Sequence, residues 1–237
     1  MYKQAFVLSR EALVESGFIP EHIRGEAAYY TFQGKEDLER LLALAEQHGA
    51  YRERGGENDV ERDPTVQQVI VYGYIRRADG RFMLYQRGSK DYDEKRLAEK
   101  VSLGVGGHME PTDLSLMDAF YRELAEETVV TANGQAMNFR RADGTTNIEL
   151  MQQYITVEPV GVIKDERDDV GKVHVGIACR LTPGENVDVS IRSDNGENVR
   201  SFYVTPSEYD TLEQSGEIAP EGWTSLVVDN ELRIGLS

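Results

Sequence analysis

The chain has 237 residues, of which 40% are hydrophobic and 29% charged, an ordinary composition for a globular protein. Its 42 acidic and 26 basic residues give a formal net charge of -16 at pH 7. This charge argues against a protein that binds nucleic acid, because each phosphate contact needs Lys or Arg. The single cysteine, Cys179, excludes an intramolecular disulfide. No apolar run of about 18 residues and no signal-peptide pattern is present, so we expect no membrane contact and a cytoplasmic location.

Residues 1–62 are expected to form a small α+β N-terminal extension. Short strands are predicted at residues 6–8 and 29–32. Apolar residues recur at helical spacing in Lys35–His48, and Gly49 follows where a helix would end, so this segment is predicted to be an amphipathic helix. Residues 52–63 are charged and contain glycine, which is typical of a linker.

Residues 63–237 are expected to form the main domain, in which strands surround one strong helix. A β-hairpin is predicted from residues 69–76 and 81–87, joined by a turn at residues 78–80. Further strands are predicted at residues 101–105, 150–157, 160–164, 173–181 and 199–204. Helices are predicted from about residue 113 or 115 to 128, at residues 206–214 and near residue 223. This order indicates an α/β fold, an α/β/α sandwich around a mixed sheet.

Three glutamates in the strong helix point to metal chemistry. Glu123, Glu126 and Glu127 are spaced i, i+3 and i+4, so their carboxylates project from one face. Neighbouring carboxylates repel one another, and a helix gains nothing from such a cluster unless solvent or a cation neutralises it. Mg²⁺ is the natural occupant, because it prefers carboxylate oxygens and shares its other positions with water and phosphates. Mn²⁺ is the alternative ion.

The opposite face of this helix is apolar and can dock on a sheet, which would place the carboxylates on a rigid element. Arg122 precedes Glu123 and lies four residues before Glu126, where it can orient a carboxylate. Two glycines, Gly106 and Gly107, stand ahead of the helix and allow the backbone to approach a ligand or metal closely.

Residues 107–130 resemble the Nudix box, Gly-x5-Glu-x7-Arg-Glu-U-x-Glu-Glu-x-Gly-U, in which U is a bulky aliphatic residue. Its second half is met by Arg122, Glu123, Leu124, Glu126, Glu127 and Val130. In the first half Gly107 matches, and Asp113 stands in place of Glu. There are two departures: eight residues instead of seven separate Asp113 from Arg122, and Val129 stands where the box has Gly. Residues 61–64, 106–108 and 169–174 are similar to a bacterial Nudix group with an N-terminal extension.

The resemblance implies a Nudix hydrolase that uses Mg²⁺ to cleave a nucleoside diphosphate linked to another moiety, by attack of water on the pyrophosphate bond. By motif position Glu123, Glu126 and Glu127 are the expected metal ligands, one of them alternatively acting as the base. The carbonyl of Gly107 is a further ligand, and Arg122 orients the carboxylates. The expected binding partner is this small-molecule substrate, a nucleoside diphosphate derivative. The N-terminal extension is expected either to cap the substrate pocket or to supply a homodimer interface.

In many Nudix relatives the base or an extra ligand comes from a separate acidic loop. Glu166, Asp168 and Asp169 are the candidates for this distal acid. Two further residues are candidate substrate contacts. His108 would contact phosphate or satisfy backbone groups in its loop. Lys172 would meet a phosphate, although a mixed-charge surface loop is the simpler interpretation.

A second hypothesis is a Nudix-fold nucleotide-binding or regulatory module with weak or no catalysis. The imperfect first half of the box favours it. The intact Arg-Glu-x-x-Glu-Glu core opposes it, because a module without chemistry does not need three mutually repulsive carboxylates.

Overall fold

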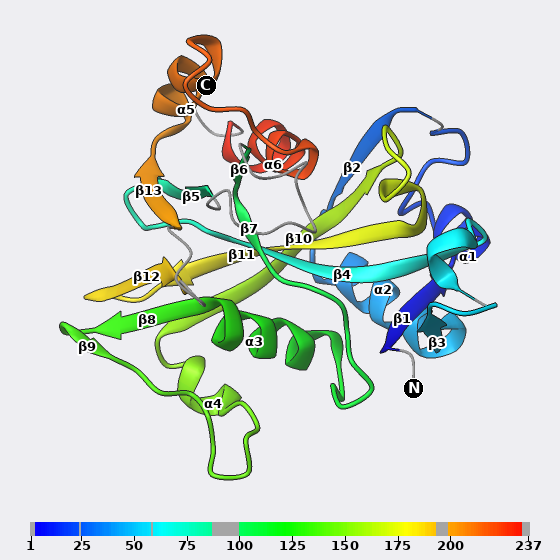
Figure 1. Cartoon of the computed structure of the whole chain (residues 1–237), viewed down its shortest axis with the longest axis horizontal. Helices are drawn as coiled ribbons and strands as arrows, with labels where there is room; N and C mark the ends of the chain where they lie inside the picture. Colours follow the sequence, from blue (N-terminus) through cyan, green and yellow to red (C-terminus); the bar gives the residue numbers. More distant parts are fainter. Residues whose placement is uncertain (1–2, 24, 58, 87–99, 193–198, 234–237) are drawn as a thin grey trace. The chain divides into compact units, whose positions relative to one another are not determined.

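The structure is a computed structural model that describes residues 3–23, 25–57, 59–86, 100–192 and 199–233 (Figure 1). The chain divides into two compact units. The first consists of Met1–Tyr72, Gly106–Phe120 and Pro159–Cys179. The second consists of Gly73–Val105, Tyr121–Glu158 and Arg180–Ser237. Three long strands and the glutamate helix contribute residues to both units.

The first unit is built on strands in the order β2-β10-β11-β4-β1-β3. Their bounds are β1 (Lys3–Ser9), β2 (Ala27–Thr31), β3 (Ala50–Arg54), β4 (Val66–Ile75), β10 (Ile155–Asp165) and β11 (His174–Pro183). β1 pairs antiparallel with both neighbours, and Val7 lies opposite Gln68 on β4 and Ala50 on β3. Helices α1 (Arg10–Glu15) and α2 (Lys35–His48) contact β1. Two 3-10 turns, η1 (Val60–Arg62) and η3 (Gly171–Val173), complete the unit.

The N-terminal predictions for this unit are largely confirmed. α2 has the predicted bounds Lys35–His48, β1 contains the predicted residues 6–8, and β2 contains residues 29–31 of the predicted strand at 29–32. The linker prediction is wrong at its start, because residues 52–54 belong to β3, which hydrogen-bonds to β1. Charged residues do not prevent this strand, because β3 is an edge strand with side chains that reach solvent. The boundary between residues 62 and 63 stays a prediction.

The second unit contains two three-stranded sheets, in the orders β12-β8-β9 and β13-β5-β6. Their bounds are β5 (Phe82–Gln86), β6 (Val101–Ser102), β8 (Thr128–Ala132), β9 (Gln135–Ala136), β12 (Val187–Ile191) and β13 (Arg200–Val204). β7 (Gly104–Val105) pairs with the end of β4. The helices are α4 (Ile148–Met151), α5 (Pro206–Gln214) and α6 (Gly222–Val227), and a π-helical turn, η4 (Val228–Leu232), follows α6.

Local signals predicted some of these elements and missed others. α5 has its predicted bounds because Thr205 and Glu208 form a capping box around Pro206. The strand predicted at residues 150–157 is wrong at its start, where α4 forms after the N-cap Asn147. β4 and β5 meet only through a bridge between Arg76 and Phe82, and β5 then pairs with β13 and β6, so the hairpin opens into two sheets. Residue 87 of that predicted hairpin lies outside the described residues.

The predicted α/β class with a mixed multi-strand sheet is confirmed. Cys179 is completely buried in β11, as its strand pattern predicts, and burial holds its pKa far above the usual value for a thiol. Within the described part of the chain, no helix combines the length and the apolar character needed to cross a membrane.

At Gly106, just ahead of the glutamate helix, the backbone passes very close to the backbone of β4. Its φ is +148°, and a Cβ built on it would lie 1.8 Å from the carbonyl oxygen of Val71. We therefore expect Gly106→Ala to lower the free energy of unfolding by about 2 to 4 kcal/mol, because both the strain and the clash involve backbone. Urea denaturation measures this loss. The matched control is Gly34→Ala, since Gly34 has nothing within 4 Å of the built Cβ. Equal effects of the two substitutions would contradict the assignment.

Candidate active site

The glutamate helix is α3 (Leu116–Glu127), and it begins one residue after Ser115. The Ser115 hydroxyl accepts a hydrogen bond from the backbone N of Asp118 at 3.1 Å, which satisfies one of the free donors of the first turn. The apolar face is buried as predicted, at Leu116, Ala119, Phe120 and Leu124. The carboxylates therefore lie on a helix that is fixed by its packing.

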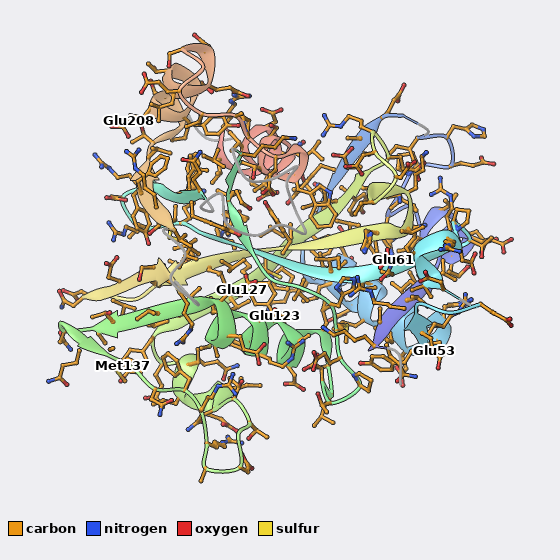
Figure 2. The ribbon with its side chains drawn as sticks, in the orientation of Figure 1. Glu53, Glu61, Glu123, Glu127, Met137 and Glu208 are labelled. Atoms are coloured by element: carbon orange, nitrogen blue, oxygen red, sulfur yellow. The ribbon has the colours of Figure 1, made fainter. Side chains whose placement is uncertain are left out.

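Arg122 contacts two of the three glutamates of α3, the helix on which Figure 2 labels Glu123 and Glu127. Its Nη1 donates to Glu123 Oε1 at 2.8 Å and to Glu126 Oε2 at 3.3 Å. The Glu123 side chain is only 14% exposed, whereas that of Glu126 is 41% exposed. Arg140 approaches the other oxygen of Glu126 at 3.4 Å. The cluster thus combines a buried carboxylate, a half-exposed one and two guanidinium groups.

Glu123 has the perturbed electrostatics of a functional carboxylate. Burial raises its pKa to about 7, and the charges of Glu127 and Glu126 push it in the same direction. Arg122 opposes this rise through its charge and its hydrogen bond. Arg122 opposes the effect of partial burial and of two carboxylate neighbours, and the pKa of Glu123 is still raised.

The donor set of α3 suits a hard divalent ion. All three donors are carboxylates, and two arginines, Arg122 and Arg140, contact the cluster. The three glutamates follow one another along the helix surface. In the described ranges, no three His, Cys, Asp or Glu side chains converge closely enough to complete a metal centre by themselves. Backbone carbonyls, water and substrate phosphates are the usual partners that complete a Mg²⁺ site.

Arg192 stabilises the carboxyl end of α3, and the sequence analysis did not detect it. Its Nε donates to the carbonyl of Glu126 at 2.9 Å, and its Nη2 donates to the carbonyls of Ala125 and Thr128 at 3.1 and 2.9 Å. Its backbone N donates to the carbonyl of Glu127 at 2.7 Å. One residue therefore satisfies four carbonyl groups at the turn that bears the glutamates. Together with Glu126 and Arg140 it lines a polar cavity of about 440 Å³.

Val129, the second departure from the box, lies in β8 and not at a helix exit. α3 ends at Glu127, and β8 begins at the next residue, Thr128. The chain therefore passes directly from helix to extended backbone, and the left-handed residue that a glycine usually provides is not used. The exit from α3 thus differs from a glycine exit, and the valine at position 129 removes no carboxylate.

The loop that precedes α3 belongs to the first unit, as do the acidic-loop candidates. The carbonyl of Gly107 accepts a hydrogen bond from the Val71 backbone N at 2.9 Å and has a second lone pair for a ligand. Asp113 closes a local turn, because its Oδ2 accepts from the backbone N of Glu110 at 2.7 Å. α3 is continuous, so the extra residue of the box is absorbed before its glutamates. Arg122 and the three glutamates lie in the second unit.

The three distal-acid candidates have different surroundings in the acidic loop. Glu166 is buried and forms ion pairs with Arg10 at 2.8 Å and Lys164 at 3.3 Å. Asp168 accepts from the backbone N of Gly171 at 2.8 Å. Asp169 is 95% exposed and pairs with Lys172 at 2.7 Å. Lys172, a candidate substrate contact, thus lies at the surface beside an acidic neighbour.

Lys164, near the end of β10, is buried although it lies in a charged stretch of the sequence. Its side chain is 1% exposed. Its Nζ donates to Gln67 Oε1 and to the carbonyls of Gly171, Lys172 and His174. Burial lowers its pKa to about 8, and Glu166 opposes that change. The charged form is therefore retained at pH 7, and it fixes the loop that follows β10.

His108 and His174 lie against each other, which the sequence did not predict. Their Nε2 atoms are 3.3 Å apart, and His174 Nδ1 lies 2.7 Å from the carbonyl oxygen of Val170. Burial lowers the pKa of both rings, that of His108 to about 3. Both imidazoles are consequently neutral at pH 7. His174 is 6% exposed.

The protein has an α/β fold in which helix α3 carries a cluster of glutamates that accept hydrogen bonds from an arginine. The family model described as NUDIX domain matches residues 66–220. Protein YmaB of Bacillus subtilis (strain 168) is 34% identical to the chain over 210 residues, covering 84% of this chain and 88% of that protein. The crystal structure of Tm1382, which is assigned to the Nudix hydrolases, superposes with a TM-score of 0.62 and 18% identity, covering 96% of this chain and 97% of that one.

The chain belongs to the Nudix family. It is a hydrolase of the pyrophosphohydrolase kind, acting on phosphorus-containing anhydrides. Enzymes of this family generally use divalent metal ions. The predicted recognition of the family from residues 107–130 is confirmed, while the roles of individual site residues stay predictions.

Arg192 is expected to contribute to the stability of α3. We predict that Arg192→Ala lowers the free energy of unfolding by about 1 kcal/mol and accelerates amide exchange in the last turn of α3, because carbonyl groups lose their donors. Arg192→Lys should recover only part of this loss, since lysine lacks the planar fork. Hydrogen exchange and urea denaturation measure both effects.

The control for Arg192 is Arg141→Ala, which removes an exposed arginine paired with Glu149 in the same unit. Exposed ion pairs contribute about 0 to 1 kcal/mol, and this pair does not contact α3's last turn. An unchanged exchange rate at Glu126 and Glu127 in Arg192→Ala would show that Arg192 does not cap the helix.

The buried histidine pair should make the protein less stable in acid. Because the folded pKa values are lowered, the unfolded chain binds more protons as pH falls through about 6.5, and stability is lost. A histidine that stays neutral in the folded state over this range, as His108 does with its pKa of about 3, costs about 1.4 kcal/mol between pH 7.5 and 5.5. The lowered pKa of His174 acts in the same direction. His174→Gln should therefore show a smaller loss over this range than the wild type. His174 is faced by the charges of Glu61, Arg54 and Lys164 and by His108.

Denaturation curves at several pH values measure this dependence. Replacement of the exposed His22 by glutamine serves as the control, and it should leave the pH dependence unchanged. Identical acid losses in the wild type and His174→Gln would contradict a neutral, buried His174.

Proposed function

We propose that the protein hydrolyses a nucleoside diphosphate linked to another moiety, using Mg²⁺ and an attacking water. The observation that supports this most is the glutamate cluster of α3. Glu123 is buried, and burial together with Glu126 and Glu127 raises its pKa to about 7. Such a cluster is costly to the fold unless a cation neutralises it. A pyrophosphate bound through the same cation explains how a chain of net charge -16 accepts an anionic substrate.

The side chains have separable tasks in this proposal. Glu123, Glu126 and Glu127 hold the ions through their carboxylate oxygens, and the Gly107 carbonyl is a further ligand. Arg122 keeps Glu123 and Glu126 in place through its two hydrogen bonds. When bound, the divalent ions neutralise phosphate charge and lower the pKa of a bound water.

The distal acid is better supplied by Asp168 or Asp169 than by Glu166. Glu166 is buried between the cations of Arg10 and Lys164, so its carboxylate has a structural partner on both sides. A base must reach its water with a lone pair and then hold a proton. Asp169 is 95% exposed and pairs with Lys172 at 2.7 Å.

Glu127→Gln tests the proposed catalytic cluster. The substitution keeps the size of the side chain and removes its charge, so we expect kcat to fall by at least about 100-fold. Chelation of divalent ions should abolish turnover of the wild type, and added Mg²⁺ should restore it. Phosphate release from a panel of dinucleotides, nucleotide sugars and nucleoside triphosphates measures activity.

Glu213→Gln is the matched control, because Glu213 is also a partly exposed helix glutamate but lies on α5. Its activity should equal that of the wild type. No turnover of any panel member, with Mg²⁺ bound, would contradict hydrolysis of this substrate class. Tight nucleotide binding that persists without metal and in Glu127→Gln would support the alternative of a binding module.

A further inference from the structure

A second metal site is indicated by three nitrogen and oxygen donors in the first unit. His108 Nε2 and His174 Nε2 are 3.3 Å apart, and Gln68 Oε1 lies 3.1 Å from His108 Nε2. The ring planes are inclined by 70°, with centroids 5.4 Å apart. Two imidazole nitrogens bound tetrahedrally to Zn²⁺ at about 2.0 to 2.1 Å lie about 3.3 to 3.4 Å from each other. The spacing of the two rings therefore matches that of two ligands on one ion.

The tautomer of His174 prepares its Nε2 for a ligand role. Its Nδ1 lies 2.7 Å from the carbonyl oxygen of Val170, and a carbonyl accepts only, so Nδ1 is the donor and bears the hydrogen. In a neutral ring the lone pair is then on Nε2, which points at His108. Metal-binding histidines usually donate their other ring nitrogen to a carbonyl or carboxylate in this way.

Gln68 lies beside the two rings with one of its amide atoms unsatisfied. The residue is completely buried, and its Nε2 has no hydrogen-bond partner within the described structure. Buried amide groups are normally satisfied on both atoms. In this position the Gln68 Oε1 atom lies next to His108 Nε2. The amide oxygen is thus a third donor atom beside His108 Nε2.

Charges of both signs act on the two rings. Arg54 acts on both, and it forms an ion pair with Glu61 at 2.8 Å. Glu61, which Figure 2 labels, also acts on His174 and is about one-third exposed. Lys3 and Lys164 are the other cations that act on the pair.

We propose that His108, His174 and Gln68 bind one divalent transition-metal ion of the Zn²⁺ class. Imidazole donors favour Zn²⁺, Co²⁺ or Ni²⁺ over Mg²⁺, so the site is chemically different from the carboxylate cluster of α3. His108 lies in the loop that opens the box, whereas His174 begins β11 directly after the acidic loop. The ion thereby ties these two loops together. This inference does not depend on the proposed hydrolysis.

The test uses the full-length protein with histidine side chains labelled by ¹⁵N, in saturating Mg²⁺ so that carboxylate sites are filled. The chain has four histidines, and His22 and His48 are exposed. Titration with Zn²⁺ should shift the imidazole signals of His108 and His174 at one equivalent and leave those of His22 and His48 in place. Calorimetry under the same conditions gives the affinity.

His108→Ala should weaken Zn²⁺ binding by at least tenfold, while His22→Gln and His48→Gln should bind as the wild type does and assign the two exposed signals. His108 is only partly buried, and the wild-type titration stands alone if the variant does not fold. Unmoved His108 and His174 signals, or an affinity unchanged in a folded His108→Ala, would overturn the proposal and leave a histidine hydrogen bond in its place.

Discussion

The repulsion among three carboxylates on α3 is the constraint around which the described structure is organised. Glu123 is buried and close in sequence to two other glutamates, and a single arginine, Arg122, bridges two of them. Other interactions must stabilise a helix that carries such a cluster. The buried apolar face of α3 contributes most of this stabilisation, because hydrophobic burial is worth far more than an exposed ion pair. In the proposed function, binding of a divalent ion relieves the repulsion among the carboxylates.

Periodicity predicted the parts of the site that depend on local sequence. The i, i+3 and i+4 glutamates, the apolar face of residues 116–124 and the capped helices α2 and α5 all follow from spacing and caps within one segment. The family followed from the same spacing. Local rules work here because an α-helix relates residues only three or four positions apart.

Sequence did not predict the contacts between distant segments. Arg192 reaches Ala125, 67 residues away, and Lys164 bonds to Gln67, 97 residues away. His108 meets His174 across 66 residues. No periodicity links such residues, since strand pairing brings them together. Lys164 shows the consequence most clearly, because a lysine in a charged stretch usually lies at the surface, and only the fold provides the ring of carbonyls that allows its burial.

The departure at Val129 illustrates how distant pairing compensates for a missing local signal. A helix commonly ends with glycine in a left-handed conformation that satisfies its last carbonyl groups. Here β8 begins at Thr128 and pairs with β12 in a register that places Ile191 opposite Thr128. Arg192 follows Ile191 and so lies at the end of α3, where its guanidinium and backbone N donate to the carbonyls that a glycine exit would have satisfied. The register of one strand pair therefore fixes the turn that bears Glu126 and Glu127, and the glycine of the box is dispensable in this chain.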